Sequence, residues 1–160
     1  METLKLTTPS DREIAMTRVF AAPRKLVFDA HTKPDLVRQW LLGPPGWSMP
    51  VCEMDVRVGG KYRWVWQHDR DGKMMGMCGV YREIVAPERL VTTEKFDEAW
   101  YSGESLNTLV LVEQGGRTTL TQTMRYESRE ARDAVIKSGM EKGVTASYDR
   151  LAELLASTSA

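Results

Sequence analysis

Alternating apolar and polar positions fill the middle of the chain and predict a series of β-strands. Residues 12–20 alternate well enough for a first strand. Beyond residue 50, apolar residues again recur with the two-residue period of strands, broken by turn residues such as Gly59-Gly60 and Gly115-Gly116. The predicted strands are residues 51–58, 61–68, 74–85, 89–96, 105–113 and 117–126. Strands this close together along a chain favour antiparallel hairpins.

Helical spacing of apolar residues appears on both sides of this region. Residues 24–31 are predicted to form a short helix after Pro23, and a second short helix begins at Pro34 and ends before the Gly-Pro-Pro-Gly run at 43–46.

The C-terminal part changes to a helical period after Ser128, which is a suitable N-cap. Gly139 and Gly143 interrupt the period, so a short helix is expected at 129–138 and a long one at 140–156. The predicted order is β-α-α-β-β-β-β-β-β-α with a long helix last. This is an α+β fold in which a curved antiparallel sheet grips the C-terminal helix and leaves space beside it, which glycines on the helix would widen.

The strand predicted at 61–68 is unusually aromatic. Tyr62, Trp64, Trp66 and His68 share one face, because side chains alternate along a strand. Such a face suits the wall of an apolar ligand cavity, and it also suits a packed core. A third alternative is that the opposite face points inward; its residues are Lys61, Arg63, Val65 and Gln67.

Composition narrows the function classes. The 160 residues suit one domain, and Lys plus Arg equals Asp plus Glu at 22 each, so no concentrated basic surface is expected and nucleic acid is excluded as a partner. The N-terminus lacks a signal-peptide core, and no apolar run is long enough for membrane insertion. Cys52 and Cys78 form no recognised motif. We expect a cytoplasmic protein without a metal site or cofactor.

Several segments together carry a family resemblance. They are Phe20 to Phe28, Trp40 before Gly43-Pro44, Asp55 to Tyr62, Gly79 to Ile84, Pro87 to Leu90, Gly116 to Thr121, and Gly139-Met140 with Gly143 leading to Leu151. In this order they strongly resemble the activator of heat-shock-protein-ninety ATPase homologue family. That family belongs to the START-like, or birch-pollen-allergen-like, superfamily of helix-grip folds (SRPBCC).

The resemblance implies a single START-like domain over residues 1–160, with an ordered core at about 11–156. It also implies a cavity between sheet and helix for lipids, sterols, polyketides or other apolar molecules, and some superfamily members are enzymes. The family's co-chaperone activity belongs to proteins with a separate N-terminal domain. Only residues 1–11 precede the first predicted strand, so we do not expect a chaperone partner.

Candidate site residues follow from the predicted inward faces. The ligand-binding candidates are Trp40, Met54, Tyr62, Trp64, Trp66, Met75, Met77, Trp100, Met140, Gly143 and Tyr148. The titratable candidates for catalysis are His68, Glu83 and Glu94. The loop 97–104, with its Trp-Tyr pair, is either a lid over the cavity or a contact in a homodimer.

Three functional hypotheses remain. The leading one is a non-catalytic protein that binds a hydrophobic small molecule, such as a lipid, sterol or polyketide, between sheet and helix. The second is a cyclase or hydrolase that acts on an apolar substrate in the same cavity. The third is a chaperone-associated or stress-response interaction module.

Overall fold

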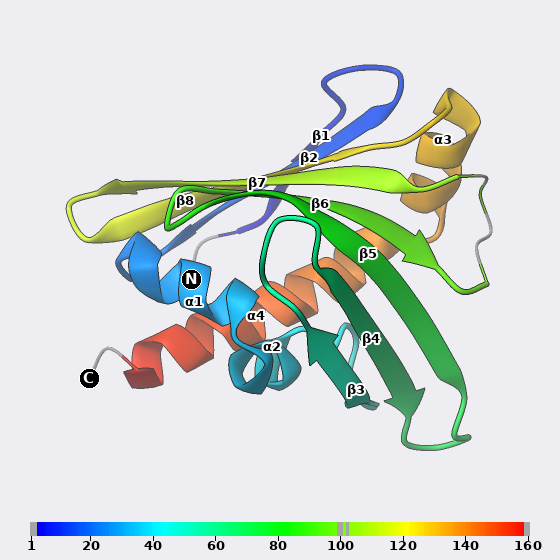
Figure 1. The fold of residues 1–160 in the computed structure, drawn as a ribbon, viewed down its shortest axis with the longest axis horizontal. Coiled ribbons are helices and arrows are strands. Elements are labelled where there is room, and N and C mark those ends of the chain that lie inside the picture. The colour runs from blue at the N-terminus through cyan, green and yellow to red at the C-terminus, as the bar shows by residue number, and fades with distance from the viewer. Residues whose placement is uncertain (1–2, 99–100, 102, 159–160) are drawn as a thin grey trace.

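A curved antiparallel sheet wraps around a long C-terminal helix in the computed structural model, which describes residues 3–98, 101 and 103–158 (Figure 1). The predicted helix-grip fold is confirmed. The strands are β1 (Lys5–Thr7), β2 (Glu13–Phe20), β3 (Trp47–Met54), β4 (Lys61–His68), β5 (Met74–Val85), β6 (Arg89–Phe96), β7 (Ser105–Gln114) and β8 (Arg117–Arg125). Their order in the described sheet is β1-β2-β8-β7-β6-β5-β4-β3.

The helices are α1 (Arg24–Thr32), α2 (Pro34–Trp40), α3 (Arg129–Lys137) and α4 (Met140–Thr158). Their boundaries follow local chemistry. Pro23 and Pro34 start α1 and α2, where a missing N–H is harmless. The Ser128 hydroxyl accepts a hydrogen bond from the Ala131 N–H at 3.0 Å and caps α3. Gly139 separates α3 from α4 with φ of 80°, a conformation that other residues rarely adopt.

Two predicted strand boundaries were wrong. β3 covers Trp47–Met54 instead of 51–58, and its pairing with β4 shifts between Ser48 and Val51. Pro50 lies in this irregular part of an edge strand, where a residue without an N–H is tolerated. β1 was not predicted, although Leu6 pairs with Met16 and extends the sheet beyond the predicted ordered core.

The main hydrophobic core lies between the concave face of the sheet and the helices. α4 crosses that face, and α1 and α2 lie together near its C-terminal half (Figure 1). Leu151, Leu120 and Leu111 are fully buried where α4 meets β8 and β7. Beside α3, a smaller cluster contains Ile14, Met124 and other residues of β2 and β8.

The ladder between β5 and β6 is interrupted. Pairing stops after Cys78–Lys95 and resumes at Tyr81–Thr92. In the gap, Thr93 makes two hydrogen bonds that each involve one side chain: its carbonyl accepts from the Tyr62 hydroxyl at 2.6 Å, and its hydroxyl accepts from the Val80 N–H at 2.9 Å. Side-chain bonds therefore replace backbone pairs across this seam.

Candidate functional site

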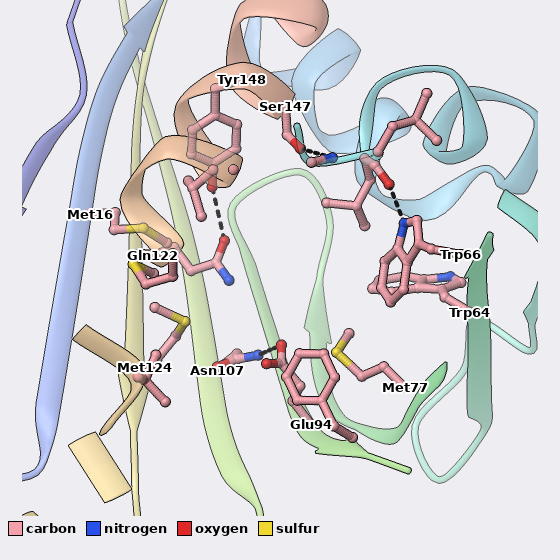
Figure 2. A pocket seen from close by; sticks show the side chains of 18 of the residues that line it. Met16, Trp64, Trp66, Met77, Glu94, Asn107, Gln122, Met124, Ser147 and Tyr148 are labelled. Atoms are coloured by element: carbon pink, nitrogen blue, oxygen red, sulfur yellow. Dashed lines mark hydrogen bonds between the residues drawn. The ribbon is translucent and has the colours of Figure 1, made fainter. Parts of the chain in front are cut away.

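A cavity of about 800 Å³ lies between the sheet and α4. Pockets that hold small molecules typically have about 300 to 1,000 Å³, so a ligand of ordinary size fits. The described lining residues come from α1, α2, β2 to β8, the connecting loops, and the α3–α4 region. Most of them are aromatic, methionine or aliphatic residues (Figure 2).

The aromatic face of β4 points into this cavity. Tyr62, Trp64 and Trp66 all line it, so the alternative in which Lys61, Arg63, Val65 and Gln67 face inward was wrong. The Trp66 indole N–H donates to the Leu41 carbonyl at 2.7 Å, which fixes that ring against the loop after α2. The Trp64 indole N–H is buried, and no described residue accepts a hydrogen bond from it.

The loop after α2 is fastened to α4. The Gly43 N–H donates to the Ser147 hydroxyl at 2.8 Å, and Arg150 donates to the Gly43 carbonyl at 2.7 Å. Gly143 then passes Pro44 closely, since an added Cβ would lie 3.3 Å from its Cδ. Gly139 and Gly143 both line the cavity, but Gly143 mainly permits this contact with the loop.

His31 lies at the α1 side of the cavity. Its Nδ1 is 2.8 Å from the Val27 carbonyl, so Nδ1 carries the proton, and the ring packs edge-on against Trp40 at 4.9 Å between centroids. Burial lowers the pKa of His31 to about 4, against a weaker opposing effect of the Val27 bond. The ring is therefore neutral at neutral pH.

Glu94 and Asn107 form a polar pair on β6 and β7, away from α4 (Figure 2). The Asn107 amide donates to Glu94 Oε2 at 2.7 Å, and the buried Asn107 Oδ1 has no hydrogen-bond partner among the described residues. Burial raises the pKa of Glu94 to about 7, although the Asn107 bond acts in the opposite direction. This carboxyl can therefore change its charge near neutral pH.

Most of the predicted ligand-binding residues line the cavity. Those lining the cavity are Trp40, Tyr62, Trp64, Trp66, Met75, Met77, Met140, Gly143 and Tyr148. Met54 instead packs at the edge of the core beside Cys52, and Trp100 lies outside the described residues. The loop 97–104, predicted to be a lid or a dimer contact, is described only in part.

Of the titratable candidates, Glu94 lines the cavity, whereas placing His68 and Glu83 there was wrong. His68 lies at the hairpin end of β4, packed against Trp47 at 5.0 Å between centroids. Glu83 follows the register shift in β5 and accepts from exposed Arg89 at 3.0 Å.

Several polar lining residues were missed. His31, Asn107 and Gln122 were not predicted to line the cavity, and Gln122 accepts a hydrogen bond from the Tyr148 hydroxyl at 3.0 Å. The alternation of β7 and β8 contained the signal, because Asn107 has the parity of inward Leu109, and Gln122 that of Leu120.

Replacing Glu94 by Gln should stabilise the protein at alkaline pH. A carboxyl whose pKa is raised in the folded state costs stability above its unfolded pKa of 4.5, and the cost reaches its full size above about 7. We expect Glu94→Gln to increase the free energy of unfolding by about 1 to 3 kcal/mol at pH 8, and by progressively less toward pH 4.5. Denaturant titrations across this pH range measure it. Exposed Glu83→Gln is the control, and a gain that does not vary with pH contradicts the prediction.

Two other features are absent from the described part of the chain. No helix there has the length and apolar character needed to cross a bilayer. Nor do residues 3–98, 101 and 103–158 bring together a metal-binding group of three or more His, Cys, Asp or Glu side chains.

Comparison with known proteins identifies the family. The family model described as "Activator of Hsp90 ATPase homolog 1-like protein" matches residues 21–156. The chain belongs to this family. The match spans α1 through most of α4 and therefore includes nearly all of the cavity.

Solved structures agree with membership in the Activator of Hsp90 ATPase homolog 1-like family. A Rhodobacter sphaeroides protein is 33% identical with a TM-score of 0.91, covering 97% of this chain and 99% of its own. A Chromobacterium violaceum protein is 28% identical with a TM-score of 0.81, covering 91% and 98% respectively. A family protein from Silicibacter pomeroyi is 21% identical with a TM-score of 0.70, covering 90% and 97%, and shows the fold alone. No curated protein matches the chain.

Proposed function

We propose that this protein binds an apolar small molecule, such as a lipid, sterol or polyketide, between the sheet and α4, without catalysis. The supporting observation is the cavity of about 800 Å³, whose wall is mainly aromatic, methionine and aliphatic side chains. Rigid rings supply apolar contact area, and methionines adapt to irregular shapes. We also propose a cytoplasmic location, which agrees with the free thiols of Cys52 and Cys78.

The cavity differs from an ordinary core in its large void and in the exposure of part of its lining. A natural interior packs at the density of organic crystals and leaves few voids larger than a water molecule. Here Met75 is 40% exposed, and Pro44, Gly139 and Lys142 are also exposed while lining the same space. These residues mark a rim through which a ligand can pass, between β5, the loop after α2 and the start of α4.

The first experiment is native mass spectrometry of freshly purified protein, together with quenching of tryptophan fluorescence by fatty acids, sterols and aromatic polyketides. Trp40, Trp64 and Trp66 line the cavity and should respond to an occupant. A bound mass and saturable quenching support the proposal. If none of these molecules binds and no bound mass is found, the proposed binding function is contradicted.

Filling the cavity should block binding. Leu109→Trp places a larger ring at a lining position on β7, whereas Val112→Trp, on the same strand, adds the same ring at a 52% exposed position. We expect Leu109→Trp to weaken binding of any ligand found above by at least about tenfold, and Val112→Trp to leave it unchanged. Isothermal titration calorimetry on folded variants measures both. If the ligand binds the two variants with equal affinity, its binding site is outside this cavity.

A cavity enzyme is a second candidate, because Glu94 lines the cavity with its pKa raised to about 7 by burial. A carboxyl with such a pKa can act as a general acid or base near neutral pH. The two candidates differ in the fate of the bound molecule. Mass spectrometry of the released ligand shows it unchanged if the protein only binds, and shows a product whose formation stops in Glu94→Gln if it is an enzyme.

A further inference from the structure

Glu94 is the one acidic residue among the described residues that line the cavity. It is half-buried, so part of its surface remains accessible although protein surrounds it. Within the part of the chain that the structure describes, Asn107 bonds to one of the two carboxylate oxygens, and the amide oxygen of Asn107 has no hydrogen-bond partner. The second carboxylate oxygen of Glu94 and the amide oxygen of Asn107 are therefore hydrogen-bond acceptors that a ligand at this end of the cavity can use.

No basic side chain of the described lining residues balances this carboxylate. Among the described lining residues only His31 and Lys142 are basic. His31 is neutral at neutral pH because burial lowers its pKa to about 4, and it lies against Trp40 on the α1 side. Lys142 is exposed at the rim on α4. A carboxylate in such surroundings is costly unless a partner supplies positive charge.

The other titratable groups near Glu94 are phenols. Burial raises the pKa of Tyr62, Tyr101 and Tyr126, and the negative charge of Glu94 raises each further; the pKa of Tyr101 reaches about 12. These phenols therefore stay uncharged at neutral pH. Their rings also line the cavity, with Tyr101 and Tyr126 packed edge to face at 5.4 Å.

A carboxylate among aromatic rings is suited to an ammonium group. The carboxylate supplies the opposite charge, and the faces of aromatic rings attract cations when water is excluded. A ligand hydroxyl could donate one hydrogen bond but would bring no charge. A ligand carboxylate would meet a like charge in an apolar site.

We propose that the ligand of this cavity carries an ammonium group on an apolar body, and that Glu94 and Asn107 bind this group. The inference rests on the proposed binding function and names the class of ligand: an apolar amine. Trp64, Trp66 and the methionines then surround the apolar body, while Glu94 and Asn107 hold its charged end (Figure 2).

The proposal fixes the pH dependence of binding. Glu94 must be ionised to pair with an ammonium group, and its pKa is raised to about 7 by burial. Amines of this kind keep their proton at neutral pH. Affinity for the amine should therefore rise with pH through about 7, while a neutral analogue shows little change.

Three probes with one apolar body test the proposal: 1-pyrenemethylamine, 1-pyrenemethanol and 1-pyrenecarboxylate. At pH 8 we expect the amine to bind at least about tenfold more tightly than the alcohol, and the carboxylate to bind most weakly. The preference for the amine should fall by about tenfold at pH 5.5, where the carboxyl is protonated. Calorimetry or pyrene fluorescence gives the affinities.

Glu94→Gln should abolish the preference for the amine, so that amine and alcohol bind with similar affinities, while Glu83→Gln should retain the wild-type order. Equal binding of amine and alcohol by the wild type, or a preference that survives in Glu94→Gln, overturns this inference but leaves the proposed function intact. Absence of binding by all three probes overturns both.

Discussion

Gly79→Ala is expected to lower the free energy of unfolding by about 3 kcal/mol, because the position has no room for a methyl group. A Cβ at Gly79 would lie 1.9 Å from the Thr93 carbonyl oxygen and 2.4 Å from the Tyr62 ring. Relief requires the backbone of β6 or the buried Tyr62 ring to move. Either movement breaks the 2.6 Å bond from the Tyr62 hydroxyl to Thr93.

Gly76 provides a matched control on the same strand. An added Cβ there would also be too close to other atoms, at 2.2 Å from the Asp97 carboxylate and 2.9 Å from the Arg63 guanidinium. Both contacts are ends of flexible, exposed side chains that form an ion pair at 2.7 Å. Displacing such a pair costs about 1 kcal/mol or less. Denaturant titrations that give the two variants equal stabilities contradict our account of the β5–β6 seam.

Trp40→Ala is expected to cost about 4 kcal/mol, because this ring joins three helices. Trp40 is 2% exposed, its indole N–H donates to the Ala30 carbonyl at 2.8 Å, and its ring stacks on Tyr148 at 5.8 Å. Removing it leaves a void between α1, α2 and α4, and the Ala30 carbonyl loses its hydrogen-bond donor.

Trp47→Ala is the control for this variant. Trp47 also lines the cavity, but it is only half-buried and packs against His68 at the hairpin end. We expect it to cost about 1 kcal/mol. Urea titrations followed by far-ultraviolet circular dichroism avoid the change in tryptophan fluorescence. If the two substitutions cost the same, Trp40 does not have the role assigned here.

The period of apolar residues predicted most of the sheet and the face of β4 that points inward. The period could not predict the interrupted pairing between β5 and β6, because the sequence does not show that Gly79 lies against the Tyr62 ring. It also misplaced β3, since Pro50 stands at an irregularity that breaks the alternation.

Alternation along a strand predicts which face of the sheet a side chain lies on. It does not predict whether the residue lies within the cavity or beyond its end. His68 shares the parity of Trp64 and Trp66 but lies beyond the cavity, at the end of its strand. Asn107 and Gln122 have inward parity, yet polar residues on a strand are ordinarily predicted to face solvent. Burial of Glu94 depends on contacts with β7 and the residues after β8, which no local pattern specifies.

His31 and Glu94 together affect the proton balance of unfolding. The folded protein keeps Glu94 protonated below about 7 and His31 unprotonated above about 4, whereas the ordinary pKa values of these groups are 4.5 and 6.5. Between pH 4.5 and 6.5, unfolding therefore releases a proton from the carboxyl and takes one up on the imidazole. Unfolding in this range exchanges no net proton through these two groups. As the pH rises, the stability cost of burying Glu94 grows while that of burying His31 falls, so the two contributions to the pH dependence of stability cancel.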